Sequence, residues 1–207
     1  ENIVRAFGGT VSYIYTITPA IAASITEAAT NGLSHNPHVT AVEMDGSVYA
    51  ADVVSELNYS WGVQKIGAGT VHASGNTGAG VKIGVVDSGI NYDHQDLNDV
   101  YRGGYDFVES QNDFGTREGD GAMDVYGHGT HVAGTIAQTT NNSLGAAGLA
   151  YESCLMPVKV LGRNGSGSYS AVADGIRFAA DNGANVINLS LGGTAASVTL
   201  ENAVRYA

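Results

Sequence analysis

An aspartate and a histidine in this sequence have the surroundings of a catalytic pair. Asp87 directly follows the apolar run at residues 81–86, and His128 lies in the segment Gly-His-Gly-Thr-His-Val-Ala-Gly, whose small residues suit the start of a packed helix. A neutral imidazole can act as a general base, and a carboxylate can fix its tautomer and balance its charge. The pair therefore indicates acid–base or nucleophilic catalysis, although each residue alone could be a helix cap or a turn residue.

A metal site is the alternative chemistry for this histidine. His131 follows His128 by one helical turn, so the two imidazoles could share a metal ion. Zinc proteases space their histidines at i and i+4 and have a glutamate after the first, whereas Gly129 stands in that place here. The general base is then missing, which disfavours metal catalysis. The single cysteine, Cys154, excludes an internal disulfide and a thiolate zinc cluster.

Alternating strand and helix patterns predict the framework that positions these residues. The apolar run at 81–86 is typical of a parallel strand buried on both faces. After it we expect a helix, a strand, a helix and a strand over residues 128–138, 155–161, 170–182 and 186–191. This order predicts an α/β fold, a doubly wound, mainly parallel sheet with helices on both faces. Ligands of such sheets bind at the carboxyl ends of the strands, where Asp87 stands.

The first fifty-odd residues follow a different pattern and predict a small α+β unit. Residues 10–17 alternate apolar and polar side chains, as a strand does. Residues 19–33 fit a helix or a strand equally well by periodicity, and residues 39–44 have the pattern of another strand. We expect two domains, residues 1–52 and residues 53–207.

Composition disfavours two kinds of partner. The chain of 207 residues has 20 acidic against 9 basic side chains and a formal net charge of -11, so binding to a phosphate backbone is improbable. No run approaches the ~18 consecutive apolar residues of a membrane-spanning helix. We expect neither nucleic acid nor a membrane as a partner.

Three segments together resemble the subtilisin-like serine proteases, the subtilases. They are Val-Asp-Ser-Gly-Ile at 86–90, the histidine segment at 127–134 and Asn-Leu-Ser-Leu-Gly-Gly at 188–193, and they follow one another in the family's order. The resemblance covers about residues 59–207. Residues 1–52 look like the family's inhibitory, ferredoxin-like propeptide without its opening strand. The resemblance thus implies a precursor fragment, a propeptide followed by the first half of a catalytic domain.

The resemblance also implies roles for individual residues. Asp87 would orient His128, and His128 would take the proton of a serine hydroxyl. The family's Gly-Thr-Ser-Met-Ala motif is absent, so the nucleophile would lie beyond this sequence. A substrate peptide would insert as a strand between two segments of small residues. These segments are Gly165, Ser166 and Gly167 on one side and Ser190, Leu191 and Gly192 on the other.

A structural calcium ion is a further implication of the resemblance. Calcium takes about six to eight oxygen ligands. The implied ligands are the carboxylate of Asp96, the side-chain oxygen of Asn142 and the backbone carbonyls of Thr140, Leu144 and Ala146. A polar turn is the alternative reading of residues 140–146. Four acidic residues between the aspartate and the histidine could bind an additional cation, with no ligands assigned, namely Asp113, Glu118, Asp120 and Asp124.

The expected function is that of a secreted, monomeric serine endopeptidase precursor. It would act on protein or peptide substrates, its own propeptide would occupy the cleft, and maturation would cut between residues 50 and 56. The resemblance also favours a strand at residues 20–26 and a helix at residues 27–35. The alternative function is a catalytically incomplete fragment that acts only as a peptide-binding or propeptide-inhibitor module.

Overall fold

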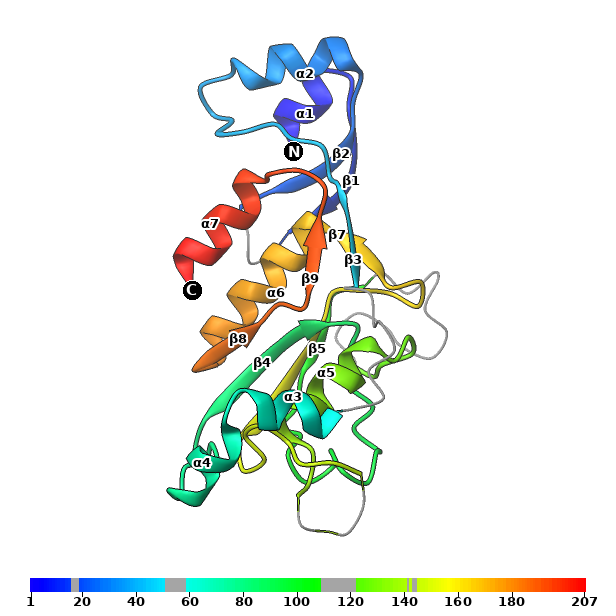
Figure 1. Cartoon of the computed structure of the whole chain (residues 1–207). Coiled ribbons are helices and arrows are strands. Elements are labelled where there is room, and N and C mark those ends of the chain that lie inside the picture. The colour runs from blue at the N-terminus through cyan, green and yellow to red at the C-terminus, as the bar shows by residue number, and fades with distance from the viewer. Residues whose placement is uncertain (16–18, 51–58, 109–121, 141, 143–144) are drawn as a thin grey trace.

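A four-stranded parallel sheet forms the centre of the molecule (Figure 1). The computed structural model describes residues 1–15, 19–50, 59–108, 122–140, 142 and 145–207. The strands lie in the order β5–β6–β4–β8, and every neighbouring pair is parallel. Their bounds are Lys82–Asp87 for β4, Tyr105–Asp106 for β5, Cys154–Lys159 for β6 and Val186–Asn188 for β8. The prediction of a parallel α/β sheet is confirmed.

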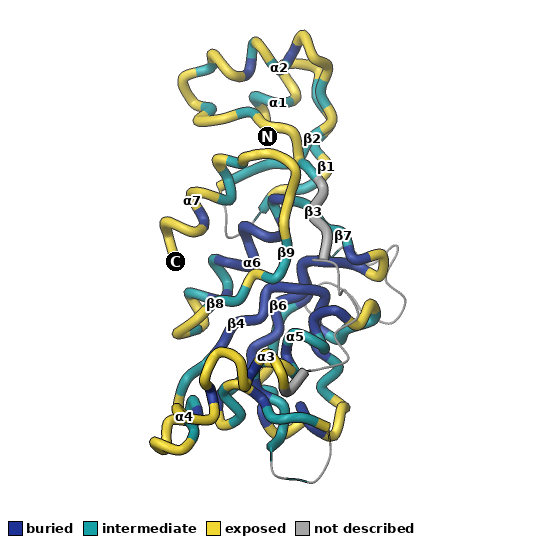
Figure 2. The backbone as a smooth tube through the Cα atoms, viewed as in Figure 1, coloured by how far each residue is buried: buried dark blue, intermediate teal, exposed yellow. Residues whose placement is uncertain are grey.

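Helices cover both faces of this sheet. On one face α6 (Tyr169–Asp181) joins a buried cluster that includes Val86 and Val158, and α7 (Val198–Tyr206) packs against α6. On the other face α5 (His128–Ala137) places Ala133 and Ala137 against a second buried cluster. Figure 2 shows that burial is concentrated in β4, β6 and α6, whereas α7 is mostly exposed. The sheet is therefore doubly wound, as predicted.

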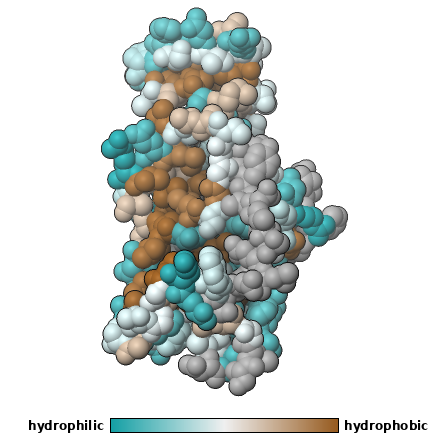
Figure 3. Space-filling model, viewed as in Figure 1, coloured by the Kyte–Doolittle hydropathy of each residue, from teal (hydrophilic) through white to brown (hydrophobic). Residues whose placement is uncertain are grey.

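Two short helices lead into the sheet, and one of its edges is apolar. α3 (Tyr59–Lys65) and α4 (Ala68–Ala73) precede β4 in the chain. β8 lies at the edge of the sheet, where Val186 and Leu189 are exposed. Apolar side chains gather on the face that carries β8 and α7 (Figure 3).

The N-terminal unit contains two antiparallel strands and two helices. Its elements are α1 (Asn2–Ala6), β1 (Thr10–Ile14), β2 (Ile21–Ser24) and α2 (Glu27–Ser34). The strand expected at residues 20–26 and the helix expected at residues 27–35 are confirmed. The change from strand to helix has a local cause, because the side chain of Thr26 caps α2 by accepting a hydrogen bond from the backbone N–H of Ala29.

Two predicted strands are wrong in their extent. Residues 39–46 form no strand, and the strand of this region is β3 (Ser47–Ala50). β3 pairs antiparallel with β7 (Ser166–Ser168) on one side and β9 (Leu191–Gly193) on the other. The strand predicted over residues 186–191 is instead divided into β8 and β9, because β9 leaves the parallel sheet and pairs with β3. Both differences arise from pairing between distant segments, which periodicity does not reveal.

Candidate active site

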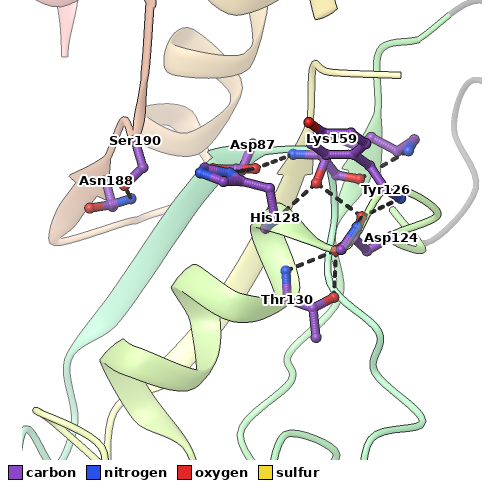
Figure 4. Close-up of polar contacts among 11 residues, drawn as sticks. Asp87, Asp124, Tyr126, His128, Thr130, Lys159, Asn188 and Ser190 are labelled. Atoms are coloured by element: carbon purple, nitrogen blue, oxygen red, sulfur yellow. Dashed lines mark hydrogen bonds and ion pairs between the residues drawn. The ribbon is translucent and has the colours of Figure 1, made fainter. Parts of the chain in front are cut away.

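Asp87 and His128 meet at the carboxyl end of β4 (Figure 4). The Nδ1 atom of His128 lies 2.8 Å from Oδ1 and 3.0 Å from Oδ2 of Asp87. Asp87 is 0% exposed and His128 is 6% exposed. A carboxylate can only accept, so Nδ1 carries the proton, and in the neutral ring Nε2 holds the lone pair. The ring is therefore held in the tautomer that a general base requires.

Glycines allow the helix to approach the end of the strand this closely. α5 begins at His128, directly after Gly127, whose φ of 106° favours glycine. A Cβ atom on Gly129 would lie 2.1 Å from the carbonyl oxygen of Gly89 and 3.1 Å from Oδ1 of Asp87. The residue after the histidine therefore has to be glycine for the aspartate and the imidazole to meet.

Burial dominates the electrostatics of Asp87 in this pair. Burial raises the pKa of the Asp87 carboxyl above its ordinary value, while the hydrogen bonds from His128 and from the backbone N–H of Ser88 lower it in part. A carboxylate that is costly to bury alone is stabilised by a neighbouring imidazolium. The pair is thus arranged to hold a positive charge on His128 when the ring takes up a proton.

Within the described residues, no serine hydroxyl is in hydrogen-bonding contact with the His128 ring, whose partner is Asp87. Ser190, a residue of one predicted peptide-binding segment, lies on the other side of the pair from Asp124 (Figure 4). Its hydroxyl accepts a hydrogen bond of 2.9 Å from the side-chain amide of Asn188. The site therefore holds a base and its orienting group, and these residues bring no nucleophile to them.

The two segments predicted to bind a peptide lie on either side of β3. In β7, Ser166 and Gly167 stand opposite residues 49 and 48 of β3, and in β9, Leu191 and Gly192 stand opposite residues 50 and 49. The other two predicted residues lie just outside the strands, because Gly165 is in a turn with a φ of 71° and Ser190 precedes β9. The structure therefore brings four of the six into one antiparallel arrangement around an extended segment of the same chain, and the other two directly precede its flanking strands.

A buried lysine near the pair was missed by the sequence analysis. Lys159 is 0% exposed, and its Nζ donates a hydrogen bond of 2.9 Å to the carbonyl oxygen of Ser88. It stands in β6 opposite Asp87 of β4. The sequence singles out Asp87 and Ser88 through their motif. It gives no local sign that a lysine in the adjacent strand is buried beside them.

Of the four acidic residues of the predicted additional cation site, the structure describes Asp124. Asp124 is half-buried, and its carboxylate accepts hydrogen bonds from backbone N–H groups and from hydroxyls. Asp113, Glu118 and Asp120 lie outside the described residues. The hydrogen bonds at Asp124 were not anticipated from the sequence.

Two described residues of the predicted calcium loop lie near one buried carboxylate. Asp96 is 6% exposed, and its Oδ1 accepts a hydrogen bond of 2.8 Å from the side-chain amide of Asn142. The backbone of Gly145 is near the other oxygen, since a Cβ atom there would lie 3.5 Å from Oδ2 of Asp96. Thr140 and Ala146 belong to the same loop, and Leu144 lies outside the described residues.

The oxygens of this loop suit a hard cation, with one carboxylate and neutral carbonyl groups. Asn142 would have to rotate its amide so that the oxygen, rather than the nitrogen, faces the ion. The described residues contain no group of three or more histidine, cysteine, aspartate and glutamate side chains that could hold a metal. Calcium at this loop would therefore depend on backbone and amide oxygens beside the one carboxylate.

In the described part of the chain, no helix has the length and apolarity needed to cross a bilayer.

Comparisons with known proteins agree with this geometry. Residues 78–206 match a family model described as the subtilase family. The chain is 40% identical over 206 residues to Subtilisin E of Bacillus subtilis (strain 168), which is 99% of this chain and 50% of that protein. It is 41% identical over 189 residues to an alkaline protease of Shouchella clausii, which is 91% of this chain and 46% of that protein. The chain spans about half the length of the curated relatives it matches.

Proposed function

Because the chain belongs to the subtilase family of serine endopeptidases, we propose that Asp87 and His128 are two members of a Ser-His-Asp catalytic triad. The observation that carries this proposal is the buried contact of 2.8 Å between Nδ1 of His128 and Oδ1 of Asp87 at the end of a parallel strand. The nucleophilic serine is supplied from outside these 207 residues, since no serine among them has the family's Gly-Thr-Ser-Met-Ala neighbours.

In the proposed reaction, the ring of His128 first accepts a proton and then donates it. Its Nε2 takes the proton of the serine hydroxyl while the serine oxygen bonds to the carbonyl carbon of the substrate. The ring then gives this proton to the leaving amine, and an acyl-enzyme remains, which water hydrolyses by the same steps. Asp87 stays ionised and stabilises the imidazolium. Its burial makes this charge interaction stronger than it would be in water.

The proposed substrates are proteins and peptides bound in an extended conformation. The support for this is the way in which β3 pairs with β7 and β9 through backbone groups. Such strand addition needs little from substrate side chains, and small residues in the flanking strands leave room for it. A Cβ atom on Gly167 would lie 2.0 Å from the carbonyl oxygen of Val160, so β7 is packed tightly from behind.

We further propose that residues 1–52 are an inhibitory propeptide and residues 53–207 part of the catalytic domain. The alignment with Subtilisin E covers 206 residues and so extends over the N-terminal unit. Carboxylates before β3 contact the first turns of two helices. Glu43 accepts hydrogen bonds of 2.9 and 3.1 Å from Ser197 and from the backbone N–H of Val198, and Asp45 accepts 3.1 and 3.2 Å contacts from Ser170. Carboxylates are favourable at helix N-termini.

Maturation and location complete the proposal. Cleavage is expected between residues 50 and 56, and residues 51–58 lie outside the described residues. N-terminal sequencing of the mature parent protein should find a start in this window, and a start beyond Trp61 or before Gly46 would contradict the assignment. We propose secretion as a monomer and a calcium-binding loop around Asp96, on the resemblance to the family. We propose no nucleic-acid or membrane partner, on the net charge of -11 and on the lack of a long apolar run in the sequence.

The decisive experiment compares variants of the full-length parent protein. Asp87→Asn and His128→Ala should each lower the rate of casein hydrolysis by at least about a thousandfold, because triad members act as a unit. Asp93→Asn, an exposed aspartate within residues 53–207, is the matched control and should keep the activity. A fluorophosphonate probe should label one serine of the parent and none in the 207-residue chain.

Labelling of the chain itself, lost in His128→Ala, would contradict the placement of the nucleophile. The alternative function, an inhibitor module without catalysis, predicts a different result. That alternative would be supported by a parent protein in which the probe labels no serine and which inhibits an added active subtilisin.

A further inference from the structure

The carboxylate of Asp124 joins the two elements that carry the candidate catalytic pair (Figure 4). Oδ1 accepts three hydrogen bonds of 2.9 Å, from the hydroxyl of Ser88 and from the backbone N–H groups of Tyr126 and Gly127. Oδ2 accepts two from Thr130, 2.9 Å from its backbone N–H and 2.5 Å from its hydroxyl. One side chain thus holds the residue after β4 and the first turn of α5 together.

Ser88 links the carboxylate of Asp124 to that of Asp87 through hydrogen bonds. Its backbone N–H donates a hydrogen bond of 2.6 Å to Oδ1 of Asp87, the same oxygen that the His128 ring contacts. Its hydroxyl donates to Asp124 and accepts a hydrogen bond of 2.9 Å from the backbone N–H of Gly129. Ser88 thus donates to the carboxylate of Asp87 and accepts from the backbone of α5. A shift of Ser88 would disturb both contacts at once.

Asp124 also replaces the cap that α5 lacks. The residue at the N-cap position is Gly127, which has no side chain to accept from the first turn. The backbone N–H of Thr130 is satisfied by Asp124, and that of Gly129 is satisfied by Ser88. Since His128 is the first residue of the helix, the position of its ring depends on how this turn is held.

We propose that Asp124 is a positioning residue that fixes the geometry between Asp87 and His128 through Ser88 and the first turn of α5. Among the described residues its carboxylate accepts hydrogen bonds from Ser88, Tyr126, Gly127 and Thr130 and none from the ring of His128, so its effect on the pair passes through other groups. Its importance for catalysis rests on the proposed function, whereas its effect on the pair does not.

The test observes the pair directly, by NMR of the full 207-residue chain, and needs no catalytic serine. The measured quantity is the exchange rate with water of the proton on Nδ1 of His128. Asp124→Asn should accelerate this exchange by about tenfold, because an amide in the same place cannot accept from all these donors. Ser88→Ala should give the same change, and the double variant should add little to either single variant.

Two control variants separate positioning from general loss of stability or charge. Val172→Ala opens the buried core at α6, away from the pair, and Asp93→Asn removes an exposed charge near β4. Both should leave the exchange rate within about twofold of the wild-type value. An unchanged rate in Asp124→Asn, or an equal change in Val172→Ala, would overturn the proposal.

If Asp124→Asn does not fold, Ser88→Ala decides by the same criterion. A parent protein without peptidase activity would refute the proposed function and leave this measurement unaffected, so the two failures are distinguishable.

Discussion

The Nδ1 atom of His128 lies 2.8 Å from Oδ1 of Asp87, although 41 positions separate the two residues in the chain. The contact joins the end of a central strand to the first residue of a helix on one face of the sheet. The contact is buried. Burial raises the free energy of the ionised aspartate and strengthens its attraction to a protonated imidazole ring. The stability of the fold and the proposed chemistry therefore depend on the same carboxylate.

The first prediction concerns the pH dependence of stability. An unfolded aspartate has a pKa of about 3.9, and burial raises the pKa of Asp87 in the folded chain. Between these two values the folded state binds more protons than the unfolded state, so the free energy of unfolding falls as the pH rises. Asp87→Asn should remove this loss. We expect a higher Tm for the variant at neutral pH.

The difference in Tm should disappear as the pH falls below about 3.9, where the carboxyl is protonated in both states. Thermal unfolding at a series of pH values measures it. The same pH dependence in the two proteins would show that Asp87 does not titrate as proposed.

The second prediction uses two glycines of α5 as a matched pair. A Cβ atom on Gly129 would lie 2.1 Å from the carbonyl oxygen of Gly89, whereas one on Gly134 would be 3.6 Å from its nearest neighbour, Oε1 of Gln138. Gly129→Ala should lower the free energy of unfolding by about 1–3 kcal/mol because of overpacking. Gly134→Ala should leave it unchanged or raise it by about 0.5–1 kcal/mol.

Urea unfolding of the two variants checks this expectation. Equal stabilities would mean that the helix can move away from the strand end without cost, which would contradict the close packing at Gly129.

The third prediction concerns calcium at the loop around Asp96. An ion that binds only the folded chain adds about 2.7 kcal/mol when its concentration is one hundred times its Kd, which corresponds to a rise in Tm of about 5–10 °C. Asp96→Ala should abolish most of the difference between calcium and chelator. Asp93→Ala, an exposed neighbour, should retain it.

Each variant is compared with itself in the two buffers, because Asp96→Ala also loses the hydrogen bond from Asn142. Identical melting curves of the folded wild-type chain with calcium and with chelator would rule the site out.

The fourth prediction concerns the contact of the N-terminal unit with α6 and α7. Glu43→Gln combined with Asp45→Asn should lower Tm by about 2 °C at low salt, because two charges that favour helix N-termini are lost. Met44→Ala changes the exposed side chain between them and serves as the control. The effect should shrink at high salt.

Hydrogen exchange gives the second measurement of this contact. Amide protection in β1 and β2 should fall in the double variant and remain in Met44→Ala. Unaltered protection would mean that the two carboxylates do not hold the N-terminal unit in place.

Local sequence patterns were sufficient for the elements whose cause is local. The apolar run before Asp87 predicts a buried parallel strand, and β4 lies there with a shift of one residue. Thr26 and Ser168 each cap the helix that follows them, so the starts of α2 and α6 are encoded within a few residues. The Asp87 and His128 motifs identified the candidate pair because strand ends and helix starts meet at the same edge of such a sheet.

Tertiary structure alone decided the features that depend on distant partners. β3 became a strand, and residues 39–46 did not, because β7 and β9 offer their backbone groups to it. Residues 186–193 divide into β8 and β9 because the two halves pair in different sheets. The five hydrogen bonds at Asp124 and the burial of Lys159 were likewise invisible in the sequence. Periodicity reports which face of an element is apolar, whereas hydrogen-bond partners across the fold are selected only when the chain is packed.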